Sequence, residues 1–409
     1  MISVALLGFG VIGSGTAEVL TQNKALIAAR LGDTVEVKYI LDLRDFPDSP
    51  FADLVVHDIA PILADEEVSV VVEMMGGLHP AYDFSRAALE AGKNVVTSNK
   101  AVVAAFGEEL LALAEERGLR YLFEASVGGG IPIIRPLCTD LAPCDITGIE
   151  GILNGTTNYI LTRMAESGAS FADALAEAQA LGYAERDPSA DVDGWDTARK
   201  ICILSALATG KIPTLEQIYV EGITRVTTAD IANAKKAGYA IRLIGTAELD
   251  GEQPRVMVCP RWVPAASPLA TVNDVFNGIL VRSDFLGDVM FYGRGAGSLP
   301  TASAVVADIL DIAGGSPCKP PRWVTAADGE LAPHSSYVCR RYLSLNAAEG
   351  WRDAVCAALG EVEYLDTEGR EVSLITAPIS EDALASALQA LEAKGVSLLS
   401  AMRLLGSSN

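Results

Sequence analysis

The sequence has few histidines, no closely paired cysteines and no long apolar run, and each absence excludes a class of protein. Three histidines, His57, His79 and His334, are too few and too scattered for a histidine-based metal site. Seven cysteines are odd in number and form no CxxC pair, which favours reduced thiols in the cytoplasm over a disulfide framework. No uninterrupted apolar run approaches the roughly 20 residues of a membrane span. We therefore expect a soluble, cytoplasmic protein without a membrane partner.

Basic residues are also scarce relative to acidic ones. Thirty-one Lys and Arg stand against 53 Asp and Glu, which gives a net charge of −22. Such a surface repels phosphate backbones, so nucleic acid is excluded as a general partner, although a local nest of N–H groups can still hold a small anion. The 409 residues, half of them apolar, are enough for roughly two to three domains with cores of their own.

The first residues predict a dinucleotide-binding fold. An apolar run over 2–7, expected to be a strand and not a signal peptide, leads into a glycine-rich turn and then a helical pattern over 17–29. Gly8, Gly10 and Gly13 fit the tight turn, the close approach of a pyrophosphate and the helix–strand packing of a dinucleotide fingerprint. Further strands are predicted over 35–41, 68–73, 94–97 and 119–123. Because helical stretches separate them, they indicate a parallel sheet with helices on both faces.

Two features near predicted strand ends bear on the ligand. Asp42 is placed to accept a hydrogen bond from a ribose 2′-hydroxyl, whereas Arg44 is placed to meet the 2′-phosphate of NADP, and NADP is slightly favoured. A surface salt bridge is the alternative for either residue. Lys100 follows another predicted strand through Thr97-Ser98-Asn99, so its ammonium should project from the sheet edge where ligands bind. A solvated charge is the alternative for Lys100.

The pattern changes after about residue 125. A turn-rich loop, Gly128-Gly129-Gly130-Ile131-Pro132, indicates the start of a second domain. Helices are predicted there over 171–181, 195–209 and 300–313, with strands near 256–259 and 278–282. The last part of the chain shows strand, helix, two strands and helix, over 336–346, 351–359, 361–365, 371–377 and 381–394. We expect it to form a small, separable α+β unit.

The stretch 182–200 is the most informative for chemistry, because five carboxylates precede a lysine within it. They are those of Glu185, Asp187, Asp191, Asp193 and Asp196. Asp196 and Lys200 are four residues apart, on one face of a helix that begins near Gly194. The functional interpretation is a carboxylate pocket for a substrate ammonium, with Lys200 as the proton donor or acceptor in a carbonyl reduction. The alternative is a solvated acidic loop with an ordinary ion pair.

In combination the motifs resemble homoserine dehydrogenase over about residues 1–320. The matching segments follow one another in family order: Gly8-Phe9-Gly10-Val11-Ile12-Gly13, Val72-Glu73-Met74-Met75-Gly76-Gly77, Thr97-Ser98-Asn99-Lys100, residues 124–134, Gly151-Ile152-Leu153-Asn154-Gly155-Thr156-Thr157-Asn158-Tyr159-Ile160, residues 182–200, and Gly293-Arg294-Gly295-Ala296-Gly297. The resemblance implies an NAD(P)-dependent interconversion of L-homoserine and L-aspartate 4-semialdehyde, a step toward threonine and methionine.

The resemblance also implies roles for particular residues. Lys200 would be the proton donor or acceptor, assisted by Lys100, and Glu185 and Asp196 would bind the amino acid with support from Asp191. The residues expected to contact NADP or NAD are Gly8, Gly10, Val11, Ile12, Gly13, Arg44, Ser98, Lys100, Gly182 and Gly297. A sodium ion would be held by main-chain groups of Glu124, Val127, Gly129 and Ile131. A homodimer or a dimer of dimers, joined through the sheet of the middle domain, is implied as well.

The expected fold class is α/β with three domains. An N-terminal Rossmann nucleotide-binding domain over 1–125 would be completed by about 295–320, an α+β catalytic and dimerisation domain would cover 126–294, and a C-terminal ACT-like α+β domain would cover 335–409. Many relatives carry an Asp-x-Pro-Gly turn after the first ACT strand. Here Asn346 is followed by Ala347-Ala348-Glu349-Gly350-Trp351. The ligand turn is therefore degraded, and the resemblance does not settle whether threonine binds there.

Two alternatives to this enzyme remain at the sequence level. One is another Rossmann dehydrogenase of amino-acid metabolism. An enzyme that forms the semialdehyde from an acyl phosphate would need an active-site cysteine with a histidine partner, and no cysteine here stands beside a histidine. The other alternative is a nucleotide- or amino-acid-sensing regulator that has lost the chemistry. The presence of both lysines and both substrate carboxylates argues against a regulator.

Overall fold

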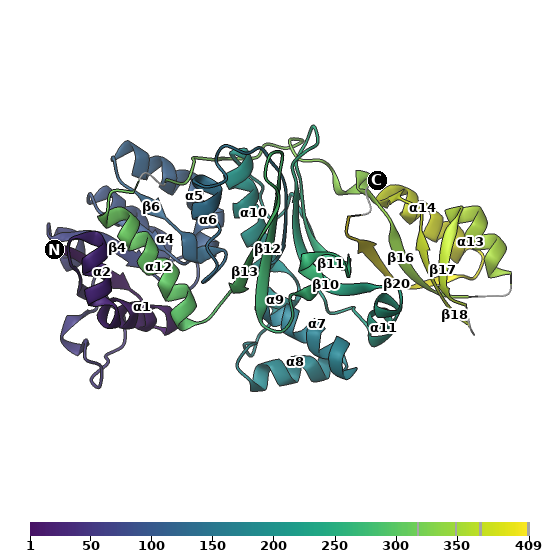
Figure 1. Cartoon of the computed structure of the whole chain (residues 1–409), viewed down its shortest axis with the longest axis horizontal. Helices are drawn as coiled ribbons and strands as arrows, with labels where there is room; N and C mark the ends of the chain where they lie inside the picture. Colours follow the sequence, from purple (N-terminus) through teal and green to yellow (C-terminus); the bar gives the residue numbers. More distant parts are fainter. Residues whose placement is uncertain (317–318, 348–349, 368–369, 407–409) are drawn as a thin grey trace.

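The computed structural model describes residues 1–316, 319–347, 350–367 and 370–406. Three units lie in a row along the long axis of the molecule (Figure 1). The purple and blue N-terminal unit is at one end, the teal middle unit follows, and the yellow C-terminal unit is at the other end. Within the described residues, no helix is long and apolar enough to cross a membrane.

The first unit is built on six parallel strands in the order β3-β2-β1-β4-β5-β6. Their bounds are Ile2–Leu7 (β1), Val35–Leu41 (β2), Val55–Val56 (β3), Val68–Glu73 (β4), Asn94–Thr97 (β5) and Tyr121–Leu122 (β6). The valine-rich β4 is buried along almost its whole length, as expected of a parallel strand covered on both faces. The strand order reverses between β1 and β4, which is the switch point where doubly wound folds bind dinucleotides. The predicted Rossmann sheet is confirmed.

Helices cover this sheet, and one of them returns from much later in the chain. The bounds are Val11–Gln22 (α1), Lys24–Leu31 (α2), Ala60–Ala64 (α3), Ala81–Glu90 (α4), Lys100–Glu116 (α5) and Ser298–Ala313 (α12). Figure 1 shows the green α12 beside the purple α1, and the Ser298 hydroxyl donates to the carbonyl oxygen of Val11 at 2.7 Å. The single helix predicted over 17–29 is in fact α1 and α2, which are separated at Asn23.

The middle and C-terminal units share one long sheet of ten strands. Along it the order is β13-β12-β7-β10-β11-β20-β16-β18-β17, and β9 pairs with β11 outside this path. The strands of the middle unit are Ile146–Ile152 (β7), Tyr219–Val220 (β9), Tyr239–Glu248 (β10), Arg255–Pro264 (β11), Phe276–Ser283 (β12) and Gly287–Arg294 (β13). Its helices are Ile134–Cys138 (α6), Gly155–Ser167 (α7), Phe171–Ala180 (α8), Ser189–Val192 (α9), Trp195–Thr209 (α10) and Thr228–Lys236 (α11).

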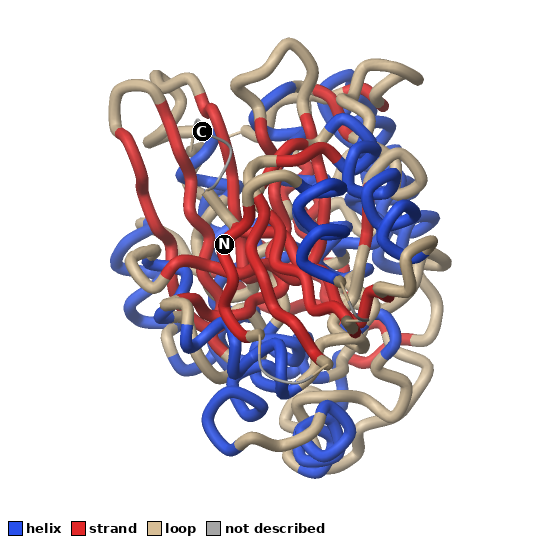
Figure 2. The backbone as a smooth tube through the Cα atoms, turned by 90° about the vertical axis from the view of Figure 1, so that its right-hand side faces the viewer, coloured by secondary structure: helices blue, strands red, loops and turns tan. Residues whose placement is uncertain are grey.

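The sequence predicted a separable C-terminal unit, but in the structure this unit continues the sheet of the middle unit. It consists of Arg341–Asn346 (β16), Trp351–Leu359 (α13), Val362–Asp366 (β17), Glu371–Thr376 (β18), Glu381–Glu392 (α14) and Ser397–Leu404 (β20). The last strand, β20, lies beside β16, and its end also pairs with β11 through Arg403 and Leu404. Seen from this end in Figure 2, the strands gather in the middle of the view, with helices beside and below them. Residues 348–349 of the degraded turn lie outside the described residues.

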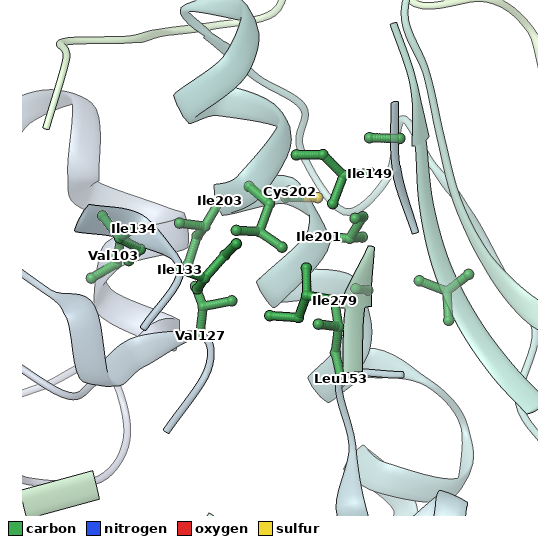
Figure 3. Close-up of a cluster of buried hydrophobic side chains, with 14 of the residues drawn as sticks. Val103, Val127, Ile133, Ile134, Ile149, Leu153, Ile201, Cys202, Ile203 and Ile279 are labelled. Atoms are coloured by element: carbon green, nitrogen blue, oxygen red, sulfur yellow. The ribbon is translucent and has the colours of Figure 1, made fainter. Parts of the chain in front are cut away.

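Helix α10 occupies the centre of the molecule, between the first unit and the long sheet. Ile201, Cys202, Ile203 and Leu204 are consecutive and all buried, so the helix is apolar around its whole circumference here, as expected of a fully buried helix. In Figure 3 the side chains of Ile201, Cys202 and Ile203 lie between Val103, Val127, Ile133 and Ile134 on one side and Ile149, Leu153 and Ile279 on the other. This packing fixes the position of Lys200, which precedes the apolar segment.

Truncation of this core is expected to be costly. Replacing Ile203 with alanine should lower the free energy of unfolding by about 2–5 kcal/mol, because a fully buried side chain leaves a cavity between two packed layers. Ile203→Val removes only one methyl group and should cost about 0.5–1.5 kcal/mol. Chemical denaturation of both variants measures the difference. Equal stability of the alanine variant and the parent chain would show that this core relaxes without loss.

Candidate active site

The glycine turn between β1 and α1 has the geometry of a pyrophosphate site. Gly8 has a φ of +89°, a conformation that favours glycine. A Cβ atom on Gly13 would lie 2.1 Å from the carbonyl oxygen of Gly8, so a side chain there cannot be accommodated. Gly10 has no atom within 4 Å of its Cβ position, and as the N-cap of α1 it makes no side-chain cap. Within the described residues, the N–H groups of Val11, Ile12 and Gly13 at the start of α1 donate no hydrogen bond, so an anion can accept from them.

Asp42 and Arg44, which the sequence presents as alternatives, form one ion pair. The Arg44 guanidinium donates from Nε to Oδ1 and from Nη2 to Oδ2 of Asp42, each at 3.0 Å. Oδ2 also accepts the backbone N–H of Phe9 at 2.8 Å, which ties the pair to the glycine turn. The Arg44 guanidinium beside it holds the pKa of Asp42 well below its usual range. The Arg44 side chain is 63% exposed, so its outer face is open to a ligand.

Two lysines from different units meet on one buried carboxylate. Lys200 Nζ lies 2.8 Å from Oδ2 of Asp196, the four-residue contact along α10 that the spacing predicted. Lys100 Nζ, at the start of α5, lies 3.1 Å from Oδ1 of the same carboxylate. Lys200 Nζ also donates to the carbonyl oxygen of Leu153 at 2.7 Å. The ammonium group of Lys200 is therefore buried and fixed, and it retains donor capacity toward the cleft.

The charge of Asp196 is secured by its surroundings. Burial opposes ionisation, but the nearby ammonium groups of Lys200 and Lys100 and a hydrogen bond from Asn154 hold the pKa of Asp196 well below its usual range. Burial, and then the charge of Asp196, raise the pKa of Asp191. Asp196 is thus a permanent carboxylate that orients both lysines, whereas Asp191 is the more easily protonated of the two.

Asn154 connects these acids to the fold, and the sequence analysis gave it no role. Its Nδ2 donates to Asp191 at 2.7 Å and to Asp196 at 2.9 Å, and its Oδ1 accepts the N–H of Thr157 at 2.9 Å as the N-cap of α7. An asparagine three residues before a threonine at the start of a helical pattern is a capping signal that could have identified it. No local pattern predicts its contacts with Asp191 and Asp196, since these residues are distant in sequence.

A cleft of about 530 Å³ opens over the two lysines, between the first and middle units. It is lined by many of the predicted site residues: Val11, Ile12, Ser98, Lys100, Val127, Gly129, Gly182, Glu185, Asp191, Asp196, Lys200 and Gly297. An adjoining cleft of about 370 Å³ shares Lys100, Glu185 and Asp196 and adds Asp187. Gly8, Gly10, Gly13, Arg44, Glu124 and Ile131 line neither cleft. The expected clustering of all five carboxylates is wrong for Asp193, which is exposed and lines neither cleft.

The loop that follows β6 is held by a buried carboxylate. The Glu124 side chain accepts the backbone N–H groups of Ile133, Ile134 and Arg135, at 2.6, 2.9 and 2.7 Å. The backbone N–H of Glu124 donates to Asp308 on α12 at 2.9 Å. The loop is therefore anchored at its start and at its end, and the Glu124 side chain is engaged by backbone donors.

Comparisons with known proteins agree with this architecture. A family model described as homoserine dehydrogenase, NAD binding domain, matches residues 8–124, and one described as homoserine dehydrogenase matches residues 132–310. Homoserine dehydrogenase of Synechocystis is 46% identical over 321 residues, which cover 76% of this chain and 73% of that protein.

Solved structures extend the similarity to nearly the whole chain. The structure of a homoserine dehydrogenase from Thiobacillus denitrificans has a TM-score of 0.91 at 35% identity and covers 98% of both chains. A hyperthermophilic archaeal homoserine dehydrogenase mutant in complex with NADPH has a TM-score of 0.67 at 29% identity, over 78% of this chain and 99% of that one. The chain therefore belongs to the homoserine dehydrogenase family of oxidoreductases.

Proposed function

We propose that the chain interconverts L-homoserine and L-aspartate 4-semialdehyde with NAD(P), a step toward threonine and methionine. The observation that carries the proposal is the buried Asp196 carboxylate, which holds Lys200 and Lys100 at 2.8 and 3.1 Å beside a cleft next to the dinucleotide turn. When it is bound, the nicotinamide supplies or accepts the hydride. The chain itself must then move one proton at the substrate oxygen.

Lys200 is the group that we assign to this proton. In the reducing direction its ammonium donates a proton to the aldehyde oxygen, and in the oxidising direction its neutral amine accepts the hydroxyl proton. Its contacts with Asp196 and with the Leu153 carbonyl oxygen fix the Lys200 nitrogen in place, so this group is already oriented before the proton is transferred. Lys100 approaches from the other side of Asp196 and assists near the substrate and the nicotinamide.

The amino group of the substrate requires negative charge in the same cleft. Glu185 lines both clefts, is exposed, and makes no ion pair within the described residues, so it is open to a substrate ammonium. Asp191 also lines both clefts. Both oxygens of Asp196 already contact lysines, so any contact between Asp196 and the substrate has to be shared with them. The cleft thus offers Glu185 as an open carboxylate for recognition and holds Asp196 as an occupied carboxylate for orientation.

For the dinucleotide, we assign the pyrophosphate to the first turn of α1 and a 2′-phosphate to Arg44. Arg44→Ala should raise the KM for NADP+ by about tenfold, because an exposed ionic contact of this kind is worth about 1–1.5 kcal/mol. The KM for NAD+, which lacks the phosphate, should change little. Initial-rate measurements with both dinucleotides test the assignment. An equal change in both constants would instead indicate that Arg44 acts only through Asp42.

The loop over 124–131 fits the sodium ion that the family resemblance implies. Within the described part of the chain, no hydrogen bond joins the carbonyl oxygens of Val127, Gly129 or Ile131 to a donor. Uncharged backbone oxygens are ligands that suit a hard cation. Val127, Gly129 and Ile131, with the main chain of Glu124, would hold the ion, which would stiffen the loop that lines the cleft.

The C-terminal unit supports an ACT-like assignment. The order β16, α13, β17, β18, α14, β20 is a βαββαβ arrangement, with the strands side by side as β20-β16-β18-β17.

We also propose a homodimer that forms through the long sheet. Half of the residues of the terminal strand β13 are exposed and the others are partly buried, and the turn before it exposes the apolar Phe285 and Leu286. An unpaired edge with apolar neighbours favours association with another chain.

A direct assay tests the proposed function. The purified chain is mixed with L-homoserine and either NAD+ or NADP+ at alkaline pH, with and without threonine, and formation of reduced dinucleotide is followed. Saturable reduction with L-homoserine, and none with L-serine, which is one methylene shorter, is the expected result. No reduction with either dinucleotide would contradict the proposal and would favour a regulator that has kept the fold.

A further inference from the structure

A buried carboxylate near the site takes no part in the mechanism described so far. Glu73 ends β4 and is 0% exposed. Its Oε1 accepts the backbone N–H of Met75 at 2.7 Å, and its Oε2 accepts the hydroxyl of Thr97, at the end of the neighbouring β5, at 2.5 Å. Within the described residues no lysine or arginine forms an ion pair with it. An unpaired carboxylate in such a place is costly, so its position requires an explanation.

From Glu73 a chain of hydrogen bonds leads to Asn99, the residue before Lys100, and to the first turn of α5. The Thr97 hydroxyl donates its hydrogen bond to Glu73, and its oxygen accepts the backbone N–H of Asn99 at 2.9 Å. The Asn99 side chain donates to the Gly77 carbonyl oxygen at 2.8 Å, and its Oδ1 accepts the N–H groups of Ala101 and Val102 as the N-cap of α5. Lys100 is the first residue of α5 and reaches Asp196 at 3.1 Å. Each link fixes the next one.

The first link requires a side chain with two acceptor oxygens. One oxygen of Glu73 takes the Met75 N–H and the other takes the Thr97 hydroxyl. A glutamine has only one acceptor oxygen, so its NH2 group would face either the Met75 N–H or the Thr97 hydroxyl. If it faces Thr97, that hydroxyl loses its acceptor, and the orientation that lets it receive the Asn99 N–H is no longer enforced.

We propose that Glu73 is a positioning residue for the reaction, acting through Thr97 and Asn99 to fix the first turn of α5 and thereby the ammonium group of Lys100 against Asp196. This inference rests on the proposed role of Lys100. The side chain of Lys100 is 38% exposed, and the inference explains why it is nevertheless held in one place.

Glu73→Gln tests the proposal, with Glu66→Gln as a matched control. Glu66 is exposed near the other end of β4 and makes no ion pair within the described residues. In Glu73→Gln, kcat for homoserine oxidation should fall by about 10- to 100-fold, because a small displacement of an assisting group costs about that much. The dissociation constant of the dinucleotide should not change, and Glu66→Gln should match the parent chain. A kcat of Glu73→Gln within about twofold of the parent would overturn the proposal.

Repeating the substitution in a Lys100→Met background separates this inference from the proposed function. If Glu73 acts through Lys100, Glu73→Gln should cause no further loss of more than about twofold there. An equal additional loss in both backgrounds would make Glu73 merely structural and would overturn the inference, while Lys100 would keep its role. Normal kcat for Lys100→Met itself would refute the proposed role of Lys100 and with it this inference.

Two further measurements distinguish a loss of positioning from a folding defect in Glu73→Gln. Thr97→Val removes the same hydrogen bond from the other side and should reproduce the loss of kcat. Thr97→Ser keeps the hydroxyl and should retain most of the parent kcat.

The pH profile gives the second readout. Burial raises the pKa of Glu73 to about 6, opposed by the hydrogen bonds from Thr97, Met75 and Asn99. The titratable group that its charge affects is Tyr121 on β6. The parent chain should therefore lose kcat for aldehyde reduction as pH falls below about 6, and Thr97→Val should not. A parent profile that is flat there would contradict the account.

Discussion

Replacement of Lys200 with alanine is expected to lower kcat for homoserine oxidation by about 10² to 10⁴, the usual contribution of a positioned general acid or base. Lys200 is the buried lysine of the cleft, and contacts with Asp196 and Leu153 hold its nitrogen. The dissociation constant of the dinucleotide should change little, because Gly8, Gly10, Gly13 and Arg44 lie outside the cleft lining that contains Lys200. Steady-state kinetics and a dinucleotide titration measure the two quantities separately.

A matched control is the removal of a lysine that lies outside the cleft. Lys211 follows α10, is exposed, and pairs with Glu330. Lys211→Ala should keep kcat and lose at most about 1 kcal/mol of stability, as expected for an exposed pair. Near-normal turnover in Lys200→Ala would contradict the assignment of the proton to this residue. The melting temperature of each variant shows whether the protein is still folded.

Asp196→Asn should have the second large effect, because it removes the charge on which two lysines converge. We expect kcat to fall by about 10² or more, since both ammonium groups lose the partner that orients them. The free energy of unfolding should fall by about 3 kcal/mol at neutral pH, since Lys200 remains buried without a counter-charge. Asp193→Asn is the control, because Asp193 is exposed and lines neither cleft. It should change neither quantity measurably.

The pH dependence of stability gives the same pair of variants a second readout. The pKa of Asp196 is lower in the folded chain than the ordinary value of about 3.9 in the unfolded chain. Its contribution to stability is therefore complete above about pH 4 and is lost as pH falls further. Asp196→Asn should lack this part of the acid sensitivity, and Asp193→Asn should retain it. Identical acid-unfolding profiles for all three proteins would show that the charge of Asp196 does not stabilise the fold.

Much of the nucleotide-binding unit could be predicted because its signals are local. The turn from Gly8 to Gly13, with a strand before it and a helix after it, is one continuous segment, and the structure has the predicted sheet. The contact between Asp196 and Lys200 was likewise predictable, since both lie on one helical face. The start of α1 was placed six residues too late, because Gly13 and Gly15 within it weaken the helical pattern.

What could not be predicted depends on contacts between distant parts of the chain. β20 was missed, although it connects the C-terminal sheet to β11, because its sequence Ser397–Leu404 lacks a clear polar and apolar alternation. Because residues of β20 are partly buried on both faces of the strand, its sequence does not alternate between polar and apolar residues. The roles of Asn154 and Glu73 likewise arise from tertiary hydrogen bonds, to Asp191 in one case and to Thr97 in the other. The ion pair between Asp42 and Arg44, which the sequence left open as the alternative for either residue, is established only by the folded chain.

The measurement that tests the site most directly is a crystal structure of the ternary complex with NADP+ and L-homoserine. The account predicts that the substrate hydroxyl lies within about 3.2 Å of Lys200 Nζ, a normal hydrogen-bond distance. It also predicts that the substrate ammonium contacts Glu185, with Asp196 still between the two lysines. A substrate whose hydroxyl faces away from Lys200, or whose ammonium lies outside the carboxylate-lined cleft, would contradict it.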